Sequence, residues 1–378
     1  MKNYKKYLIM KKIENLKMPE TNIYFENNAN LEKIKDKKIA IIGYGNQGRA
    51  QALNLRDSGL DLIIGNKEDS YKEKAMKDGF ETFNISEVVK RADIVFLLTP
   101  DETMPDMFEK EIEPNLKDGA CINFASGYNI AFNLINPPDN IDVIMIAPRM
   151  IGVGVRENYL NGEGFYSFIG VYQEVTGNAK EILLALAKAL GTLKKGGVEI
   201  SMKQEAILDL FNEQAFGPAF GRVLLTCIKV LINNGLPPEA VLIEMYMSNE
   251  MSYTYQKMAQ IGLVKQTNFH SHTSQYGAMS RGVRYRKLPL EEKMQKSFDE
   301  IASGKFAKEW SGKVSKLKFK IIKYFAMKQE INKIEQEVRK NLKLKDFDVY
   351  SAPENIEELL KKPDVKNELK NILDSFEF

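Results

Sequence analysis

Cysteine is scarce in this sequence, and its scarcity excludes two classes of protein. The chain of 378 residues contains only two cysteines, Cys121 and Cys227, which lie far apart in apolar segments. No C-x-x-C pair or other zinc-binding spacing occurs, so neither a disulfide scaffold nor a zinc site is expected. We expect both thiols to be reduced and buried in a hydrophobic core, in a cytoplasmic protein.

Long apolar runs and an excess of one charge are missing as well. No stretch of 18 apolar residues occurs, so we expect no membrane-spanning helix. The basic N-terminal segment contains only "YLIM" (7–10), which is too short for the apolar region of a signal peptide. The 54 basic and 51 acidic residues leave a net charge of +3, which gives no support for nucleic acid as the main partner. A small molecule is the expected partner.

Hydrophobic residues make up 44% of the chain, which is enough for a sizeable core in two domains. Residues 37–195 alternate between short apolar runs and polar helical segments. This alternation predicts an α/β domain of the Rossmann type, with a doubly wound and mostly parallel sheet. The expected strands are 38–43, 60–65, 92–99, 120–125, 143–148 and 165–173, and the helices between them include 46–58, 70–79 and 102–116.

The second half of the chain has a different pattern. Residues 203–233 and 238–260 are rich in Leu, Met, Ile and Ala without alternation, which predicts long helices. The following segment is irregular and contains both histidines. The expected divisions are an N-terminal extension (1–21), a Rossmann-type domain (22–198), an all-α domain (199–330) and a charged C-terminal surface appendage (331–378).

A glycine-rich motif of the form G-x-G-x-x-G follows the first expected strand and opens a helix. Its residues are Gly43, Tyr44, Gly45, Asn46, Gln47 and Gly48. The motif alone is a weak signal, but this context is that of a dinucleotide site. In such sites the first glycine allows the tight turn, and the second lets the backbone approach a pyrophosphate at the helix N-terminus. A glycine-rich turn without a ligand is the less favoured reading.

The end of the second strand bears on the choice between NAD and NADP. NAD-binding domains place Asp or Glu there, to bind the ribose 2′-hydroxyl. This chain has Asn66, followed by Lys67 and Ser70, whose side chains suit a 2′-phosphate. Glu68 and Asp69 lie in the same loop and could serve NAD, so the residues favour NADP and leave NAD open.

Two carboxylates interrupt the apolar segment 203–217. Asp209 and Glu213 are four residues apart, so on a helix they share a face, with Cβ atoms about 5–6 Å apart. One interpretation is a solvated face near the start of a helix. The other is a magnesium site, because Mg²⁺ takes oxygen ligands from one or two carboxylates together with substrate.

Eight segments, roughly within residues 22–312, resemble ketol-acid reductoisomerases (acetohydroxyacid isomeroreductases) and occur in the same order. They are "IAIIGYGNQGRAQALNLRDSG", "LLTPDE", "EIEPNLKDGA", "FASGYNI", "DVIMIAP", "VYQEVTGNAKE", "DLFNEQ" and "SGKFAKEW". The resemblance implies a Rossmann-type N-terminal domain. It also implies a knotted, all-helical C-terminal domain that binds metal and substrate, and a homodimer with shared active sites.

The resemblance also implies a chemistry, within branched-chain amino acid biosynthesis. NADPH would be the cofactor, and two Mg²⁺ ions would be held by carboxylates of both subunits. An alkyl group would migrate within 2-acetolactate or 2-aceto-2-hydroxybutyrate before hydride reduces the resulting ketone. Asp209 and Glu213 match the metal-binding motif D-L-F-x-E-Q. Further cofactor contacts are implied for Pro100, Asp101 and Gly127.

Two catalytic positions depart from the family pattern. The histidine of the family's "FAHGFNI" is Ser126 here, and the lysine of its "APK" is Arg149. Arginine stays protonated and is a poor proton donor or acceptor. In the turn that follows, Val153 and Gly154 stand where the family has a His-Thr pair.

The second metal-binding pair of the family, E-x-x-x-E, is also disturbed. Alignment backwards from "QIGL" puts Glu250 on the second Glu and Tyr246 on the first. Alignment forwards from Pro238 puts Glu244 on the first Glu and Ser248 on the second, so the segment is two residues longer than expected. Glu244 and Glu250 lie about 120° apart on a regular helix, and a π-bulge would be needed to bring them to one face. One Mg²⁺ is expected and the second is left open.

Ser271 matches a serine of the family's substrate loop, and histidines flank it. A histidine in such a place is more often an ordinary polar residue than a catalyst. Either His270 or His272 could nevertheless replace the proton-transfer group that is lost at Ser126.

Three functions fit these residues. The chain is a divergent ketol-acid reductoisomerase, a reductase of another 2-oxo acid or imine that lacks isomerase activity, or a non-catalytic nucleotide-binding protein. Alkyl migration needs cations that polarise neighbouring oxygens, whereas hydride transfer needs an oriented nicotinamide, one electrophilic group and a proton source. We therefore favour a magnesium-assisted, NADP-dependent oxidoreductase acting on a 2-oxo acid.

Overall fold

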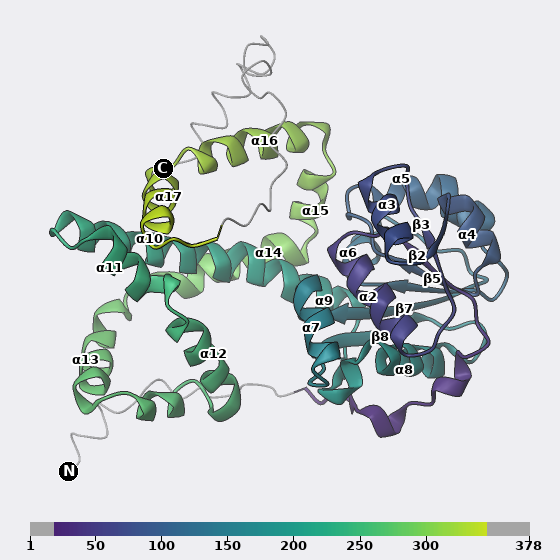
Figure 1. Cartoon of the computed structure of the whole chain (residues 1–378), viewed down its shortest axis with the longest axis horizontal. Helices are drawn as coiled ribbons and strands as arrows, with labels where there is room; N and C mark the ends of the chain where they lie inside the picture. The colour runs from purple at the N-terminus through teal and green to yellow at the C-terminus, as the bar shows by residue number, and fades with distance from the viewer. Residues whose placement is uncertain (1–18, 346–378) are drawn as a thin grey trace, which may run out of the picture. The chain divides into compact units, whose positions relative to one another are not determined.

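The computed structural model describes residues 19–345, so expectations for 1–18 and 346–378 lie outside the described residues. The chain divides into two compact units, which meet between Leu208 and Asp209. The sequence places this boundary at 198/199, before the helix that the division crosses. Each unit is described by itself (Figure 1).

The first unit contains a nine-stranded sheet with the order β1-β9-β8-β7-β6-β5-β2-β3-β4. Neighbouring strands are parallel except for the pairs β7/β8 and β1/β9, which confirms the predicted mostly parallel sheet. The strands are β1 (Ile23–Tyr24), β2 (Ile39–Ile42), β3 (Leu62–Gly65), β4 (Glu81–Phe83), β5 (Ile94–Leu97), β6 (Cys121–Phe124), β7 (Asp142–Pro148), β8 (Ser167–Gln173) and β9 (Gly197–Glu199). All six predicted strands occur. The strands β1, β4 and β9 were not predicted, because two or three residues are too few to show a pattern.

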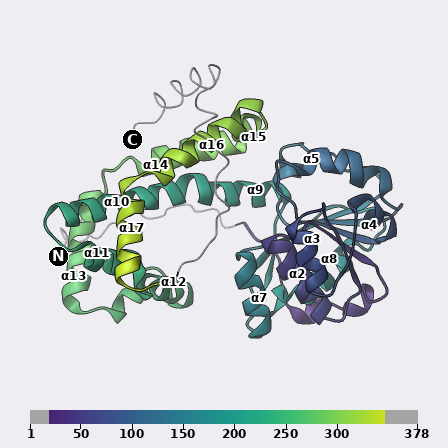
Figure 2. The ribbon, with the colours of Figure 1, turned by 45° about the horizontal axis from the view of Figure 1, so that its top comes forward.

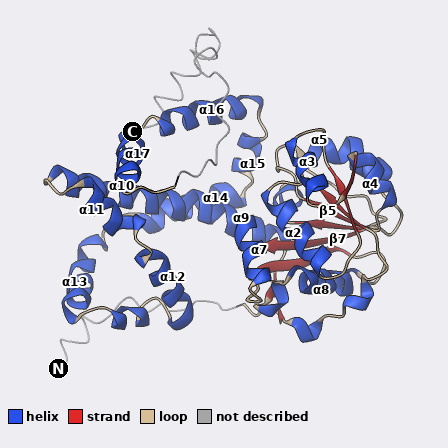
Figure 3. Cartoon of the chain, in the orientation of Figure 1, coloured by secondary structure: helices blue, strands red, loops and turns tan. Residues whose placement is uncertain are grey.

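Helices cover both faces of this sheet (Figure 3). They are α2 (Asn46–Asp57), α3 (Ser70–Lys77), α4 (Ile85–Arg91), α5 (Met104–Met107), α6 (Tyr128–Ala131), α7 (Gly152–Leu160) and α8 (Ala179–Leu190), with short turns η1 (Glu26–Asn28), η2 (Leu31–Lys33), η3 (Phe108–Ile112), η4 (Glu113–Asn115) and η5 (Thr192–Lys194). The helix expected over 102–116 is divided into α5, the π-helical η3 and the 3-10 turn η4. Pro114, which has no amide hydrogen, lies in η4 and does not continue the helix.

The central strand shows how one sheet serves two hydrophobic cores. Ile39 and Ile41 of β2 pack in the cluster that contains residues of α2 and α8. Ala40 and Ile42 pack in the cluster that contains residues of α4 and α5. Because both faces are buried, the strand is apolar without interruption, as is typical of parallel sheets.

In the second unit, every regular element within residues 209–345 is a helix, as the sequence predicts. The elements are α9 (Met202–Phe211, which begins in the first unit), η6 (Asn212–Phe216), α10 (Gly217–Asn233), α11 (Pro238–Leu242), η7 (Ile243–Met247), α12 (Glu250–Ile261), η8 (Lys265–Phe269), α13 (His272–Gly282), η9 (Val283–Tyr285), α14 (Leu290–Ala302), α15 (Lys305–Trp310), α16 (Lys313–Met327) and α17 (Glu330–Asn341). Both η6 and η7 are π-helical turns. The knot implied by the family resemblance stays a prediction.

Helix α17 lies beside α10 and α11 (Figures 1 and 2). Val338 of α17 is buried in a cluster with Ile228, Val241 and Leu242, which belong to α10 and α11. The start of the expected surface appendage (331–378) therefore packs into the helical unit.

The continuous helical stretch Met202–Asn233 is the one part of the described chain that is long and apolar enough to cross a membrane. Its most apolar window has a mean hydropathy of 1.6, and only 11% of that window is buried. By length and composition, this differs from the sequence expectation of no spanning helix. Such helices also occur in proteins that do not cross membranes. Cys227 is exposed on this helix, so the expectation that both cysteines are buried was wrong.

Candidate functional site

One edge of the sheet gathers every site residue predicted in the first unit. The strands β2, β3, β5, β6 and β7 run parallel, so the segments that follow them lie at the same edge. These segments are residues 43–48, 66–70, 100–101, 126–127 and Arg149. The strand order reverses beside β2, which pairs with β3 on one side and β5 on the other. Open α/β sheets bind ligands at such a switch point.

The glycine turn leaves an open cradle in front of α2. Gly43 has a φ of +92°, and a Cβ there would lie 2.8 Å from the carbonyl oxygen of Leu98, so only glycine fits. A Cβ at Gly45 would meet no atom within 4 Å. Gly45 also provides no side-chain cap for α2, which leaves the first-turn amide groups of the helix without a side-chain acceptor. This is the geometry of a pyrophosphate site.

The buried side chain and the backbone of Tyr44 anchor this turn through hydrogen bonds. The side chain is buried, its hydroxyl donates to Asp78 Oδ2 at 2.9 Å, and its backbone N–H donates to Asn66 Oδ1 at 3.1 Å. Arg49 donates from Nε and NH2 to both oxygens of Asp78, at 2.6 and 3.0 Å. Burial, together with Asp78, raises the pKa of Tyr44 above its usual range. The hydrogen bonds from Arg49 lead the causes that lower the pKa of Asp78.

The acidic residues in the loop after β3 are occupied by contacts within the loop. Asp69 Oδ1 accepts the backbone N–H groups of Tyr71 and Lys72, at 2.9 and 3.1 Å, and so caps α3. The same oxygen accepts Asn66 Nδ2 at 2.8 Å. Glu68 forms an ion pair with Lys72. One oxygen of each carboxylate is therefore used within the loop.

The remaining polar groups of this region fit a phosphorylated ligand. Lys67 and Ser70 are exposed at the end of β3, and their side chains have no hydrogen-bond or ion-pair partner among residues 19–345. Thr99 Oγ1 is buried and also lacks a partner in the described chain. Its Cγ2 would lie 2.9 Å from a Cβ at Gly43, so this unpaired hydroxyl is beside the glycine turn.

Glu205 of α9 organises the other end of the site, and the sequence analysis missed it. The residue is wholly buried. Its Oε1 accepts Arg149 NH2 at 2.8 Å, and its Oε2 accepts the backbone N–H of Gly127 at 2.6 Å. Arg149 also donates from Nε to the Ala147 carbonyl at 3.2 Å, and it lies 4.9 Å from the centre of the Phe168 ring. The residue in place of the family lysine is thus held as a fixed cation.

A signal for Glu205 was present in the sequence. It lies four residues before Asp209, which itself lies four residues before Glu213. Three carboxylates at helical spacing in an apolar segment indicate that at least one of them is buried with a partner.

The turn after β6 packs tightly on α9. A Cβ at Gly127 would lie 2.1 Å from the carbonyl oxygen of Met202, so no other residue fits there. Ser126 Oγ accepts the backbone N–H of Tyr128 at 3.2 Å. The Tyr128 hydroxyl is buried without a partner among the described residues. Burial, with Asp101 nearby, raises the pKa of Tyr128 to about 12.

The segment after Arg149, which departs from the family, packs against the glycine motif. Gln47 Nε2 donates to the Met150 carbonyl at 2.9 Å. A Cβ at Gly152 would lie 2.2 Å from the carbonyl oxygen of Asn46. Val153, at one of the family's His-Thr positions, is exposed and apolar. The departures therefore lie beside the nucleotide turn.

The second unit carries the predicted metal and substrate residues. Asp209 is in the last turn of α9 and Glu213 is in η6. Ser271 caps α13, because its Oγ accepts the backbone N–H of Ser274 at 3.3 Å. Glu244 lies in η7, whereas Glu250 begins α12. No three His, Cys, Asp or Glu side chains within residues 19–345 are grouped as a metal site.

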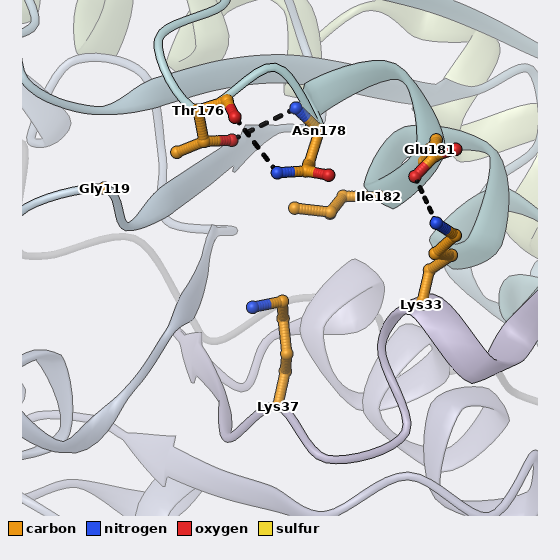
Figure 4. A pocket seen from close by; sticks show the side chains of 7 residues that line it. All are labelled: Lys33, Lys37, Gly119, Thr176, Asn178, Glu181 and Ile182. Atoms are coloured by element: carbon orange, nitrogen blue, oxygen red, sulfur yellow. Dashed lines mark hydrogen bonds and ion pairs between the residues drawn. The ribbon is translucent and has the colours of Figure 1, made fainter.

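A cavity of about 390 Å³ in the first unit has none of the predicted site residues in its lining (Figure 4). It is lined by Lys33, Lys37, Gly119, Thr176, Asn178, Glu181 and Ile182. Lys33 and Glu181 form an ion pair of 2.7 Å across one side of it. Lys37 and Gly119 precede β2 and β6, so the cavity is at the opposite edge of the sheet from the glycine turn.

Comparison with known proteins accounts for both units. Residues 33–196 match the family model described as acetohydroxy acid isomeroreductase, NADPH-binding domain, and residues 202–344 match ketol-acid reductoisomerase, C-terminal domain. The ketol-acid reductoisomerase (NADP+) of Pyrococcus abyssi is 40% identical over 296 residues, covering 78% of this chain and 89% of its own length. That of Methanopyrus kandleri is 37% identical over 330 residues, covering 86% of this chain and 99% of its own length.

A solved structure agrees with these relatives. The NADH-preferring ketol-acid reductoisomerase from an uncultured archean superposes with a TM-score of 0.79 at 33% identity, over 84% of this chain and 98% of that one. The fold and both family matches agree with the motifs from the glycine turn to "SGKFAKEW". The chain belongs to the ketol-acid reductoisomerase (acetohydroxy acid isomeroreductase) family of oxidoreductases.

Proposed function

We propose that this chain is an NADPH-dependent, magnesium-assisted oxidoreductase that reduces a 2-acetolactate-like or other 2-oxo acid, with or without alkyl migration. The observation that carries this proposal is the open cradle at Gly45, at the switch point of the sheet, in a chain of this family. The backbone at Gly45 is open on the side where a Cβ would lie, and the uncapped amide groups at the start of α2 would bind a pyrophosphate there.

The loop after β3 supports NADPH over NADH. A 2′-phosphate adds negative charge, and Lys67 and Ser70 offer a cation and a hydroxyl that are not used elsewhere in the described chain. Asp69 caps α3 and Glu68 pairs with Lys72. Both carboxylates thus take part in structural contacts within the loop, whereas the side chains of Lys67 and Ser70 do not.

Arg149 suits the binding of a substrate carboxylate. A guanidinium group remains charged and attracts carboxylates. Its contacts with Glu205, the Ala147 carbonyl and Phe168 fix the orientation of the cation. Arg149 would then orient the substrate and would not move a proton.

Reduction of the substrate carbonyl requires a hydride, a proton and a group that polarises the carbonyl. The glycine turn at residues 43–48, with Lys67 and Ser70, would hold NADPH, which would supply the hydride that forms the new C–H bond and leave as NADP+, while the carbonyl π-bond breaks and its oxygen takes up a proton. Asp209 and Glu213 would hold a magnesium ion through their carboxylate oxygens, and such an ion would polarise the carbonyl. We assign the substrate-binding turn to Ser271, with His270 or His272 as the proton source in place of Ser126.

The exposed apolar side chains of α10 support a homodimer with shared active sites. Phe220, Val223 and Val230 are exposed on a helix of which little is buried in one chain. Burial of apolar surface stabilises by about 25 cal/mol per Å². Covering this helix with a second copy of the chain would therefore contribute favourable free energy to association. The exposed, free thiol of Cys227 on the same helix fits a reducing cytoplasm.

The second candidate is a reductase of a different 2-oxo acid or imine that lacks isomerase activity, and Ser126 and Arg149 favour it. Both replace groups that the family uses for proton transfer. A non-catalytic nucleotide-binding protein is the third candidate, and the retained Asp209, Glu213 and Ser271 oppose it.

NADPH oxidation with Mg²⁺ tests the proposal on two substrates. One is 2-acetolactate, and the other is 3-hydroxy-3-methyl-2-oxobutyrate, which needs reduction alone. Turnover of both supports a complete reductoisomerase, and turnover of the second alone supports the reductase. Turnover of neither overturns the proposed substrate class.

A further inference from the structure

The helical segment that follows Pro238 is interrupted before it can present two carboxylates together. The π-helical turn η7 ends at Met247, and Ser248 is extended, with φ −75° and ψ 154°. Asn249 occupies the N-cap position of the next helix without a side-chain capping bond, and Glu250 is the first residue of that helix. Helices α11 and α12 consequently run in different directions (Figure 1).

This break separates Glu244 from Glu250. Residues four apart on one helix face the same side. Here the Ser248 N–H closes η7 on the Ile243 carbonyl at 3.0 Å, and the chain then changes direction before Glu250. Both glutamates are exposed, and neither side chain has a hydrogen-bond or ion-pair partner among residues 19–345.

No shift of register restores a pair. The residue four before Glu250 is Tyr246, a phenol whose hydroxyl donates to Glu335 of α17. Tyr246 packs with the cluster around Val338, so its side chain serves the core of the unit. The residue four after Glu244 is Ser248, which is the break itself.

Two residues, Ser248 and Asn249, separate η7 from α12, and the segment is expected to be two residues longer than the family pattern. Removal of Ser248 and Asn249 from "EMYMSNE" (244–250) leaves "EMYME". In that sequence the two glutamates are four residues apart, as a metal-binding pair on one helical face requires. Two inserted residues therefore separate the carboxylates without replacing either one.

We propose that Glu244 and Glu250 do not form a metal site, and that each subunit holds one divalent cation, at Asp209 and Glu213. The residues present do not fit the two-ion set that the family implies. The inference rests on the proposed function, and it further assigns this chain to reduction without alkyl migration.

The number of bound ions tests the inference directly. Mn²⁺ prefers the same oxygen ligands as Mg²⁺, and its free concentration can be followed by electron paramagnetic resonance during titration of the metal-free, full-length protein. We expect saturation at one Mn²⁺ per chain. Saturation at two, or no specific binding, overturns the inference.

Substitutions locate the ion. Asp209→Asn should abolish Mn²⁺ binding, whereas Glu244→Gln and Glu250→Gln should each leave one Mn²⁺ per chain. Retained binding in the first variant, or lost binding in either of the others, overturns the assignment. These three substitutions keep the chain length, so they remain informative if a deletion prevents folding.

The sharpest variant lacks Ser248 and Asn249. It should bind two Mn²⁺ per chain, while the equal-length control Ser248→Ala/Asn249→Ala should still bind one. Circular dichroism checks that both variants are folded. A folded deletion variant that still binds one Mn²⁺ overturns the role given to the break.

Failure of this inference can be told apart from failure of the proposed function. NADPH binding, followed by nicotinamide fluorescence without metal, and reduction of 3-hydroxy-3-methyl-2-oxobutyrate test the function. One Mn²⁺ per chain without reduction refutes the function and leaves the ion count standing. Two Mn²⁺ per chain with reduction, or turnover of 2-acetolactate, refutes the inference and leaves the function standing.

Discussion

Arg149 and Glu205 form an ion pair in which NH2 and Oε1 are 2.8 Å apart, and the glutamate is wholly buried while the arginine is 26% exposed. The second oxygen of Glu205 accepts the Gly127 amide. One side chain thus joins the segment after β7 to the turn after β6, the two places where this chain departs from its family's catalytic residues.

Glu205→Gln should destabilise the protein by about 2 kcal/mol. Loss of one partner from a fully buried pair costs about 3–5 kcal/mol, and the partial exposure of Arg149 reduces that figure. Urea unfolding measures the change. The control Glu181→Gln, which removes an exposed ion pair with Lys33, should cost about 0.5 kcal/mol or less. Equal losses in the two variants would contradict the structural role given to Glu205.

Lys67→Asp should shift cofactor preference from NADPH towards NADH by about 10- to 100-fold in the ratio of kcat/KM values. A hydrogen bond to a charged group contributes about 1.5–3 kcal/mol, and the new carboxylate repels a 2′-phosphate. Steady-state kinetics with both cofactors measures the ratio. The same change at Lys90, exposed on α4, should leave it unmoved. An unchanged ratio in Lys67→Asp would remove this residue from the 2′-phosphate site.

Asp78→Asn should destabilise the protein in a pH-dependent manner. The lowered pKa of Asp78 means that its ionised form is stabilised by folding. That stabilisation is complete above the unfolded pKa of about 3.9, and it is lost as the pH falls through the lower folded value. Thermal melts of wild type and variant should therefore differ at pH 7 and converge in acid. For Asp106→Asn, which weakens an exposed contact with Lys110, the melts should coincide at both pH values.

Val230→Glu should dissociate the proposed dimer. A charge on the apolar face of α10 would be buried without a partner in the assembled protein, which is unfavourable. Size-exclusion chromatography with light scattering measures the mass. The control Met76→Glu, an exposed apolar position on α3 of the first unit, should not change it. A wild-type protein that is monomeric at micromolar concentration would refute the proposed homodimer.

The parallel sheet could be predicted because its strands are buried on both faces. Buried runs such as Ile39–Ile42 are apolar without interruption, and the glycine turn that follows has a fixed spacing. The strands β1 and β9 could not be predicted. Ile23–Tyr24 and Gly197–Glu199 pair with each other although they lie near opposite ends of the first unit in sequence, and each is too short to show a local pattern.

The candidate site was partly visible in the sequence. The motif around Asp209 and Glu213 is evident, but the bond from Glu205 to Arg149 joins residues 56 positions apart, and only the fold brings them together. The extra length of the segment around Ser248 was visible in the sequence, but the extended conformation of that residue was not. The segment contains neither proline nor glycine, and one extended residue is enough to end a helix.

Two carboxylates can stop acting as a metal-binding pair even though both residues remain in the sequence. Substitution of a glutamate leaves a mark that any comparison of related sequences detects at once. An insertion of the length of Ser248 and Asn249 would leave Glu244 and Glu250 in the sequence but place them on separate helical elements, η7 and α12. In evolutionary terms, a short insertion of this kind can alter a reaction at one step, and its reversal requires no new side chain.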